Sequence, residues 1–172
     1  MEIERKFLVK HLPEGLDLHP HCEIEQGYLC SHPTVRIRRI DNRYVLTVKE
    51  HLRTDSSAIV NREEEFEMRA DDYLRLREKC DGRLLSKTRY RILLRRLHAD
   101  GNFDDLVAEL DLFHGRHEGL MLVEVEFPHT LEADAFEPPD WFGADVSHDP
   151  RYRNSRLAAS ERPPFLNTST PQ

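Results

Sequence analysis

The chain has 172 residues, of which 33% are charged and 38% hydrophobic, and its formal net charge is −7. This length is typical of one domain with a sizeable core, and the composition is too apolar for a disordered chain. The acidic balance disfavours a general nucleic-acid binder, because such proteins are usually basic. No apolar run approaches the roughly 20 residues of a membrane-spanning helix, and we expect neither a signal peptide nor a membrane partner.

The cysteines indicate the compartment. The chain has only three cysteines, Cys22, Cys30 and Cys80, which is an odd number, and no two of them form a CxxC pair. This usage fits a reducing cytoplasm better than a disulfide framework, so we expect a cytoplasmic protein. The ten histidines show no zinc-type spacing and are interpreted as surface residues.

The first residues predict a β-strand with two different faces, because side chains two positions apart share a face. One face is charged, with Glu2, Glu4 and Lys6. The other is apolar, with Ile3, Phe7 and Val9, and Arg5 is its charged exception. Taken alone, this pattern favours a half-exposed edge strand whose charged face lies in water.

Seven further segments alternate in the same way, and turn signals separate them. These predicted strands are 23–31, 34–40, 43–50, 60–69, 83–95, 103–113 and 120–128. Asp100-Gly101-Asn102 predicts a hairpin turn between two of them. A helical apolar stripe predicts a helix over 71–80, with Asp71 or Asp72 as its cap.

A short acidic helix is expected from Leu131, and another helix over 151–159. We therefore assign residues 1–160 to one domain and expect a disordered tail over 161–172. Eight strands with hairpin connections predict a mainly β fold of the α+β class with flanking helices, either a strongly curved sheet or an antiparallel closed barrel. In such a barrel the charged faces could point outward into water, or inward.

The charges are sorted by sign, which favours the inward arrangement. The cationic rows contain Arg36 with Arg38 and Lys87 with Arg89, whereas the anionic rows contain Glu63, Glu65 and Glu67 and Glu124 with Glu126. Like charges at this spacing repel unless a facing strand or a ligand compensates them. Carboxylates bind hard divalent cations, and Arg and Lys bind phosphate oxygens, so the sequence indicates a metal-complexed polyphosphate in a polar tunnel.

The motifs resemble those of a known family. Glu2-Ile3-Glu4-Arg5-Lys6 is similar to the ExExK signature of the CYTH superfamily, the triphosphate tunnel metalloenzymes. The resemblance continues, in the family's order, through 26–29, 35–38, 46–49, 65–67, 87–90, 109–113, 124–126, 141–143 and 151–154. It is strongest to the short bacterial members, which are typically inorganic triphosphatases. It implies an eight-stranded tunnel barrel, a C-terminal plug helix and hydrolysis of triphosphates with Mg²⁺ or Mn²⁺.

The resemblance also implies roles for individual residues. The expected metal ligands are Glu2, Glu4 and Glu126, with Glu124 and Asp111 nearby, and with Glu65 and Glu67 for a second metal or a water. The expected triphosphate ligands are Lys6, Arg36, Arg38, Lys49, Lys87, Arg89 and, on the plug helix, Arg151. Ser155 departs from the family pattern, because close relatives can carry a lysine there.

Two residues are candidates for the general base, Lys87 and Tyr28. A lysine crowded by Arg89 is expected to have a lowered pKa, which favours the neutral amine. The alternatives left open are a nucleoside or thiamine triphosphatase, a class IV-type adenylate cyclase and a non-enzymatic polyphosphate-binding module. The sequence does not determine the oligomeric state, and a homodimer is one alternative.

Overall fold

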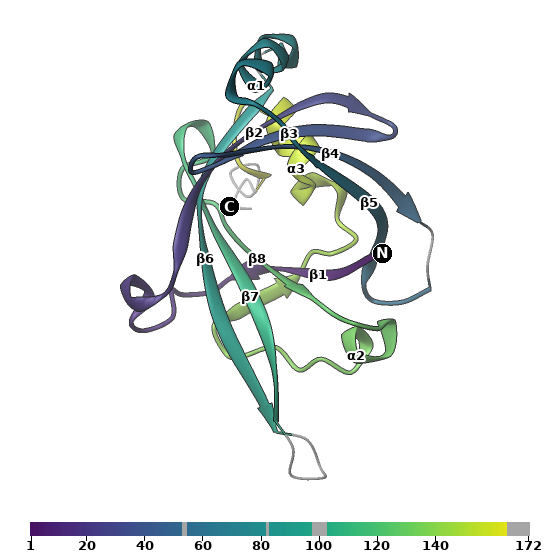
Figure 1. The fold of residues 1–172 in the computed structure, drawn as a ribbon. Helices are drawn as coiled ribbons and strands as arrows, with labels where there is room; N and C mark the ends of the chain where they lie inside the picture. Colours follow the sequence, from purple (N-terminus) through teal and green to yellow (C-terminus); the bar gives the residue numbers. More distant parts are fainter. Residues whose placement is uncertain (53–54, 82, 98–102, 165–172) are drawn as a thin grey trace, which may run out of the picture.

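The computed structural model describes residues 1–52, 55–81, 83–97 and 103–164. Its main feature is an antiparallel barrel in which eight strands follow the order β5-β4-β3-β2-β6-β7-β8-β1, closed by pairing of β1 with β5 (Figure 1). The strands are β1 Glu2–Val9, β2 His21–Ser31, β3 Thr34–Ile40, β4 Arg43–Leu52, β5 Ile59–Glu67, β6 Leu84–Leu97, β7 Phe103–Phe113 and β8 Met121–Glu126. All eight predicted strands are present, and the predicted closed barrel is confirmed.

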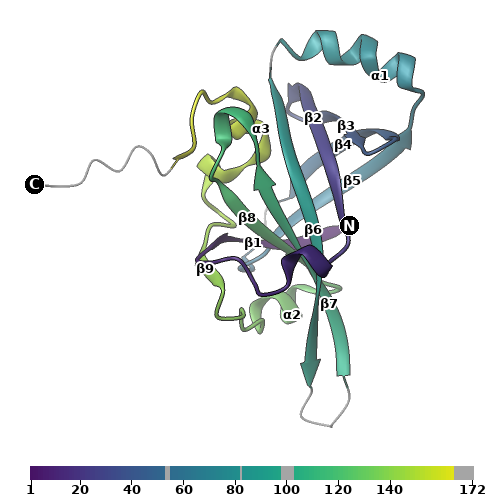
Figure 2. The ribbon, with the colours of Figure 1, turned by 90° about the vertical axis from the view of Figure 1, so that its left-hand side faces the viewer.

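A ninth strand, β9 (Phe142–Asp145), was not predicted. It is only four residues long and follows a proline-rich segment, so its alternation is too short to detect. β9 pairs with the second half of β1, beside the three residues of β1 that pair with β5. The β6–β7 hairpin extends beyond the body of the barrel (Figure 2). Its predicted turn at 100–102 lies outside the described residues, as does the predicted tail from 165 onward.

The helices are short. They are α1 Ala70–Arg77, α2 Thr130–Asp134 and α3 Asn154–Ala159, with single 3-10 turns η1 Leu16–Leu18, η2 Glu78–Cys80, η3 Gly115–His117 and η4 Pro150–Tyr152. The predicted helix over 71–80 is thus α1 followed by η2, and that over 151–159 divides into η4 and α3. The predicted cap is wrong, because Arg69 holds the N-cap position and Asp71 and Asp72 lie in the first turn. No helix within the described ranges has the length and apolar character needed to cross a membrane.

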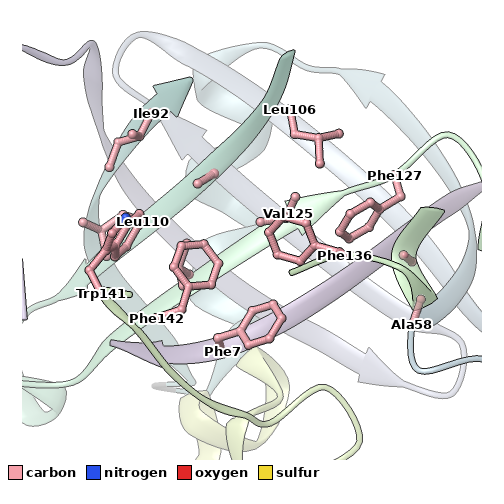
Figure 3. Packing of buried hydrophobic residues seen from close by; sticks show 13 residues of the cluster. Phe7, Ala58, Ile92, Leu106, Leu110, Val125, Phe127, Phe136, Trp141 and Phe142 are labelled. Carbon is pink, nitrogen blue, oxygen red and sulfur yellow. The ribbon is translucent and has the colours of Figure 1, made fainter. Parts of the chain in front are cut away.

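The largest apolar core lies on the outer side of the barrel wall. Phe7 is buried and Ile3 and Val9 pack beside it, which confirms the predicted apolar face of β1. The rings of Phe7 and Phe142 are 5.1 Å apart, and Phe136 packs against both (Figure 3). Because these apolar side chains take one face of each strand, the alternate side chains face the barrel interior.

Helix α1 covers a second apolar cluster on β2, β3 and β4, where Tyr73 and Cys80 pack against Ile37. Gly27 on β2 allows this approach, since a Cβ atom there would lie only 2.5 Å from Sγ of Cys80. Its role is therefore steric.

Helix α3 packs against β2 and β6. Its residues Leu157 and Ala158 share a third apolar cluster with Tyr28, Leu85 and Leu122, whose positions in their strands face the barrel interior. This contact places α3 over one end of the barrel, as expected of the plug helix (Figure 1).

Candidate active site

The charged rows of the predicted strands meet inside the barrel. Lys49 on β4 contacts Glu4 on β1, and Arg89 on β6 contacts Glu124 on β8, although neither pair of strands is adjacent in the sheet. Such pairs pass over one face of the strand between them, and the outer face there is occupied by the apolar core. The structure therefore places these charges on the inner face rather than in bulk water.

Carboxylates gather on three neighbouring strands, β8, β1 and β7. They are Glu2, Glu4, Glu109, Asp111, Glu124 and Glu126, which we call the acidic wall. Glu4 and Glu126 are directly opposite each other in the β1–β8 register. Burial, and then Glu124 and Glu2, raise the pKa of Glu4 to about 7, although Lys49 opposes the shift. Burial and the nearby Glu109, Glu2 and Glu124 likewise raise the pKa of Glu126.

This crowding bears on whether the residues suit a divalent metal ion. The raised pKa values of Glu4 and Glu126 show that burial, and after it the neighbouring carboxylates, disfavour negative charge on these two groups. Mg²⁺ and Mn²⁺ prefer oxygen ligands, and carboxylates are the groups found here. No set of three or more potential ligands already converges on one point among the described side chains. The donor chemistry fits a metal ion, but the ligands would have to move together.

Lys49 contacts the part of the acidic wall that lies on β1. Its ammonium nitrogen pairs with Glu2 and lies 3.8 Å from Oε1 of Glu4 and 3.3 Å from Oε2 of Glu63 on β5. Burial would lower the pKa of Lys49, but Glu4 and Glu2 raise it well above its usual value. Lys49 therefore stays charged at any physiological pH.

A second network links the acidic wall to Lys6, Lys87 and Arg89. The Lys6 ammonium is 2.8 Å from Glu124, and Arg89 binds Asp111 through two nitrogens at 2.6 and 2.7 Å. Burial alone would raise the pKa of Glu124, but Lys6 and Arg89 hold it well below its usual range. Glu124 is thus ionised, and both Asp111 and Glu124 are already paired with cations.

Two guanidinium groups extend from β3 into the interior. Arg36 lies 3.4 Å from Glu63, and Arg38 pairs with Glu65. Within the described part of the chain, the buried Nε atoms of both arginines have no hydrogen-bond partner. Buried donors without partners are costly, and a phosphate oxygen is a ligand that would satisfy them.

The two candidate bases lie in different environments. Burial, and then Arg89, lower the pKa of Lys87 to about 8, in the predicted direction. Its ammonium lies 2.5 Å from Oδ2 of Asp111. Burial raises the pKa of Tyr28 above its usual value, so its phenol is neutral, and it accepts a hydrogen bond from Gln26 at 2.7 Å. This environment favours Lys87 over Tyr28 as a base.

Two predicted site residues, Glu67 and Arg151, lie away from this centre, and a third, Glu65, lies at its margin, paired with Arg38. Glu65 and Glu67 are 44% and 79% exposed, and Glu67 pairs with the exposed Arg43. Arg151 is 65% exposed and binds Asp149, two residues before it in the chain. Their predicted roles as metal or phosphate ligands receive no support from these positions.

Three residues that lie at the site were not predicted as site residues: Glu63, Glu109 and Gln26. Glu63 contacts both Lys49 and Arg36, and Glu109 pairs with Arg89. The sequence could have indicated both glutamates, because Glu63 shares a strand face with Glu65, and Glu109 shares one with Asp111. Gln26 lies within the 26–29 motif, but its hydrogen bond to Tyr28 became visible only in the folded chain.

The barrel and its charged interior agree with comparisons to known proteins. No model of a protein family matches the chain. The chain is 39% identical over 163 residues to the inorganic triphosphatase of Nitrosomonas europaea. This alignment covers 92% of the present chain and 97% of the relative. The inorganic triphosphatase of Acetivibrio thermocellus is 33% identical over 174 residues, or 96% of each chain.

The chain belongs to the inorganic triphosphatase family. A crystal structure of an inorganic triphosphatase superposes with a TM-score of 0.65 at 37% identity, covering 93% of this chain and 95% of that one. A Hippeastrum protein described as a candidate adenylyl cyclase with a dominant triphosphatase activity has a TM-score of 0.51 at 15% identity. That match covers 78% of this chain and 83% of the other, and it shows the fold alone.

Proposed function

We propose that this protein hydrolyses inorganic triphosphate to pyrophosphate and phosphate, with Mg²⁺ or Mn²⁺ as its cofactor. The observation that carries the proposal is the pairing of a crowded acidic wall with buried guanidinium groups inside one barrel. Both curated relatives are inorganic triphosphatases, which supports the same substrate for this chain.

Glu2, Glu4 and Glu126 are the residues that would hold the metal ion. The raised pKa values of Glu4 and Glu126 support this choice, because burial and the neighbouring carboxylates disfavour their negative charge and a divalent cation would compensate it. Such an ion supplies charge neutralisation and orientation for the phosphate oxygens. Glu124 and Asp111 are instead proposed to hold Lys6, Lys87 and Arg89 in place, since each carboxylate already contacts two of these cations.

The triphosphate would lie along Arg36, Arg38 and Arg89, with Lys6 and Lys49 at the acidic wall. Phosphoryl transfer needs mainly alignment and stabilisation of charge, which fixed guanidinium groups provide. Lys87 is the proposed base that accepts a proton from the attacking water, because its lowered pKa makes the neutral amine accessible near neutral pH. Tyr28 is neutral and is proposed to donate a hydrogen bond instead.

A cytoplasmic location remains our proposal for the protein. The three cysteines are unpaired in the structure, which suits a reducing compartment. A homodimer and the absence of nucleic-acid partners remain predictions from the sequence.

Phosphate release from tripolyphosphate, ATP and thiamine triphosphate, each with Mg²⁺ or Mn²⁺, tests the proposed function. We expect the highest kcat/KM with tripolyphosphate and no turnover in excess EDTA. Preferential conversion of ATP to cyclic AMP, or binding of tripolyphosphate without turnover, would contradict the proposal.

The Glu4→Gln variant tests the metal site. Removing this carboxylate charge should lower kcat/KM for tripolyphosphate by roughly 100-fold, the scale of losing one preorganised electrostatic group. The apparent metal requirement should rise with it, measured by titrating Mn²⁺ at fixed tripolyphosphate. Glu50→Gln, on the exposed part of β4, is the matched control and should retain activity. Full metal-dependent activity in Glu4→Gln would refute the assignment.

A further inference from the structure

Lys49 lies where two of the proposed metal ligands meet. Its ammonium pairs with Glu2, lies 3.8 Å from Glu4 and reaches Glu63 on the next strand at 3.3 Å. The carboxylates themselves do not form a ready ligand set in the part of the chain that the structure describes. The positive charge among them belongs to a lysine side chain.

An ammonium and a divalent cation compete for the same carboxylate oxygens. Both are attracted by negative charge, and each oxygen that accepts a hydrogen bond from Lys49 is less available to a metal ion. Lys49 can leave without unfolding the barrel, because its charge sits at the end of a flexible four-carbon chain. Binding of a metal ion to Glu2 and Glu4 would therefore displace the ammonium.

The position of Lys49 in the sheet indicates where the displaced ammonium can go. The β3–β4 register pairs Lys49 with Thr34 and Thr47 with Arg36, so Lys49 and Arg36 are diagonal neighbours on the inner face. Arg36 is also a group whose Nε lacks a partner within the described chain. An ammonium released from the carboxylates stays beside the groups proposed to bind phosphate.

We propose that Lys49 is a tethered counter-ion of the metal site, which a divalent cation displaces toward the triphosphate. The proposal rests on the proposed function, since it takes Glu2 and Glu4 as metal ligands. It couples the two ligands: the metal ion frees a phosphate-binding cation, and triphosphate draws that cation away from the metal ligands. Such coupling is reciprocal by thermodynamic necessity.

Metal affinity in the absence of triphosphate gives the sharpest test. Titration calorimetry with Mn²⁺ should show about tenfold tighter binding to Lys49→Met than to the natural protein, within the range typical of coupled sites. Lys49→Arg keeps the positive charge and should bind Mn²⁺ within about twofold of the natural protein. Lys49→Gln should repeat the Lys49→Met result and replaces it if thermal melting shows that Lys49→Met does not fold.

Lys87→Met is the matched control for net charge. It removes the same ammonium group from the same interior, but Lys87 pairs with Asp111 and not with the proposed metal ligands. We expect Mn²⁺ affinity to rise much less in Lys87→Met than in Lys49→Met. Equal effects of the two variants, or unchanged or weaker binding in Lys49→Met, would overturn the proposal.

Glu4→Gln separates this inference from the proposed function. It should weaken Mn²⁺ binding in both the natural and the Lys49→Met backgrounds. If Glu4→Gln leaves Mn²⁺ affinity unchanged, the proposed metal site is wrong. If Glu4→Gln weakens binding but Lys49→Met does not tighten it, the metal site stands and the counter-ion role of Lys49 is wrong.

Discussion

Lys87 shows how strongly the barrel changes the chemistry of one residue. Its side chain is 1% exposed, and burial and the neighbouring Arg89 lower its pKa to about 8 from an ordinary value of 10.5. Asp111 opposes the shift but does not cancel it. A lysine that is fully protonated on a protein surface at pH 8 is therefore about half neutral here.

We expect kcat/KM to rise with pH and to level off above about pH 8, because only the neutral amine of Lys87 can accept a proton. A pH–rate profile with tripolyphosphate measures this, since kcat/KM reports the pKa values of the free enzyme. Lys87→Arg keeps the charge but cannot deprotonate, so it should lose about 100-fold or more in rate and lose the rise near pH 8. An unchanged rise in Lys87→Arg would assign the titration to another group.

Among the elements, β1 depends on a residue that is not in the active site. Arg5 is the charged exception on the apolar face of β1, and the structure explains its presence. Its guanidinium binds Asp145 on β9 at 2.7 Å and donates to the carbonyl oxygens of Ala133 and Phe136, close to the end of α2. Arg5 therefore joins β1, β9 and the α2 region while the opposite face of β1 stays free for the site.

Arg5→Met should lower the free energy of unfolding by about 2 kcal/mol, because it removes the cation paired with Oδ2 of Asp145 and one donor from each of two carbonyl oxygens. Chemical denaturation measures the difference, and the exposed Lys10→Met should change stability by less than about 0.5 kcal/mol.

The pKa of Asp145 is lowered by its hydrogen bonds to Ser147 and Arg5 against the effect of burial. A carboxylate with a lowered pKa stabilises the fold above its unfolded pKa, and this stabilisation is lost as pH falls through the folded value. The difference in unfolding free energy between the natural protein and Arg5→Met should therefore decrease in strong acid. A difference that does not change with pH would contradict the ion-pair explanation.

In the whole molecule, the barrel closes through a short seam. Only Glu2, Ile3 and Glu4 of β1 pair with β5, opposite Asn61, Val60 and Ile59. Two of these three residues are proposed metal ligands, and across the seam β5 carries Glu63 and the next strand, β4, carries Lys49. Ligands bound inside the barrel would therefore bridge the seam from both sides.

Hydrogen exchange should detect this bridging. We expect the amides of 2–4 and 59–61 to exchange faster than those of the central β6–β7 pairing, because few contacts hold the seam. Addition of Mn²⁺ with a non-hydrolysable triphosphate should slow exchange at the seam more than in β7, since ligand binding stabilises the elements that it joins. Equal protection of both regions by the ligands would argue that they do not bridge β1 and β5.

Much of this protein follows from the sequence, because period-two alternation is a local property of the chain. Same-sign rows such as Arg36 with Arg38, and Glu124 with Glu126, predicted strands, an inward charged face and a polyphosphate ligand. The barrel confirms the predicted fold. The capping of α1 and the existence of β9 were not predictable in this way. Arg69 replaces the expected cap, and β9 is held by pairing to β1 rather than by its own pattern.

What only the tertiary structure decided is which charges meet. Ion pairing depends on distances across the barrel interior, between strands far apart in the sequence, and no local pattern contains them. The sequence alone therefore determined the barrel, its charged lining and the class of ligand. The folded chain determined that Arg151 lies in solvent beside Asp149, that burial lowers the pKa of Lys87, and that the Lys49 ammonium lies among the carboxylates expected to bind metal.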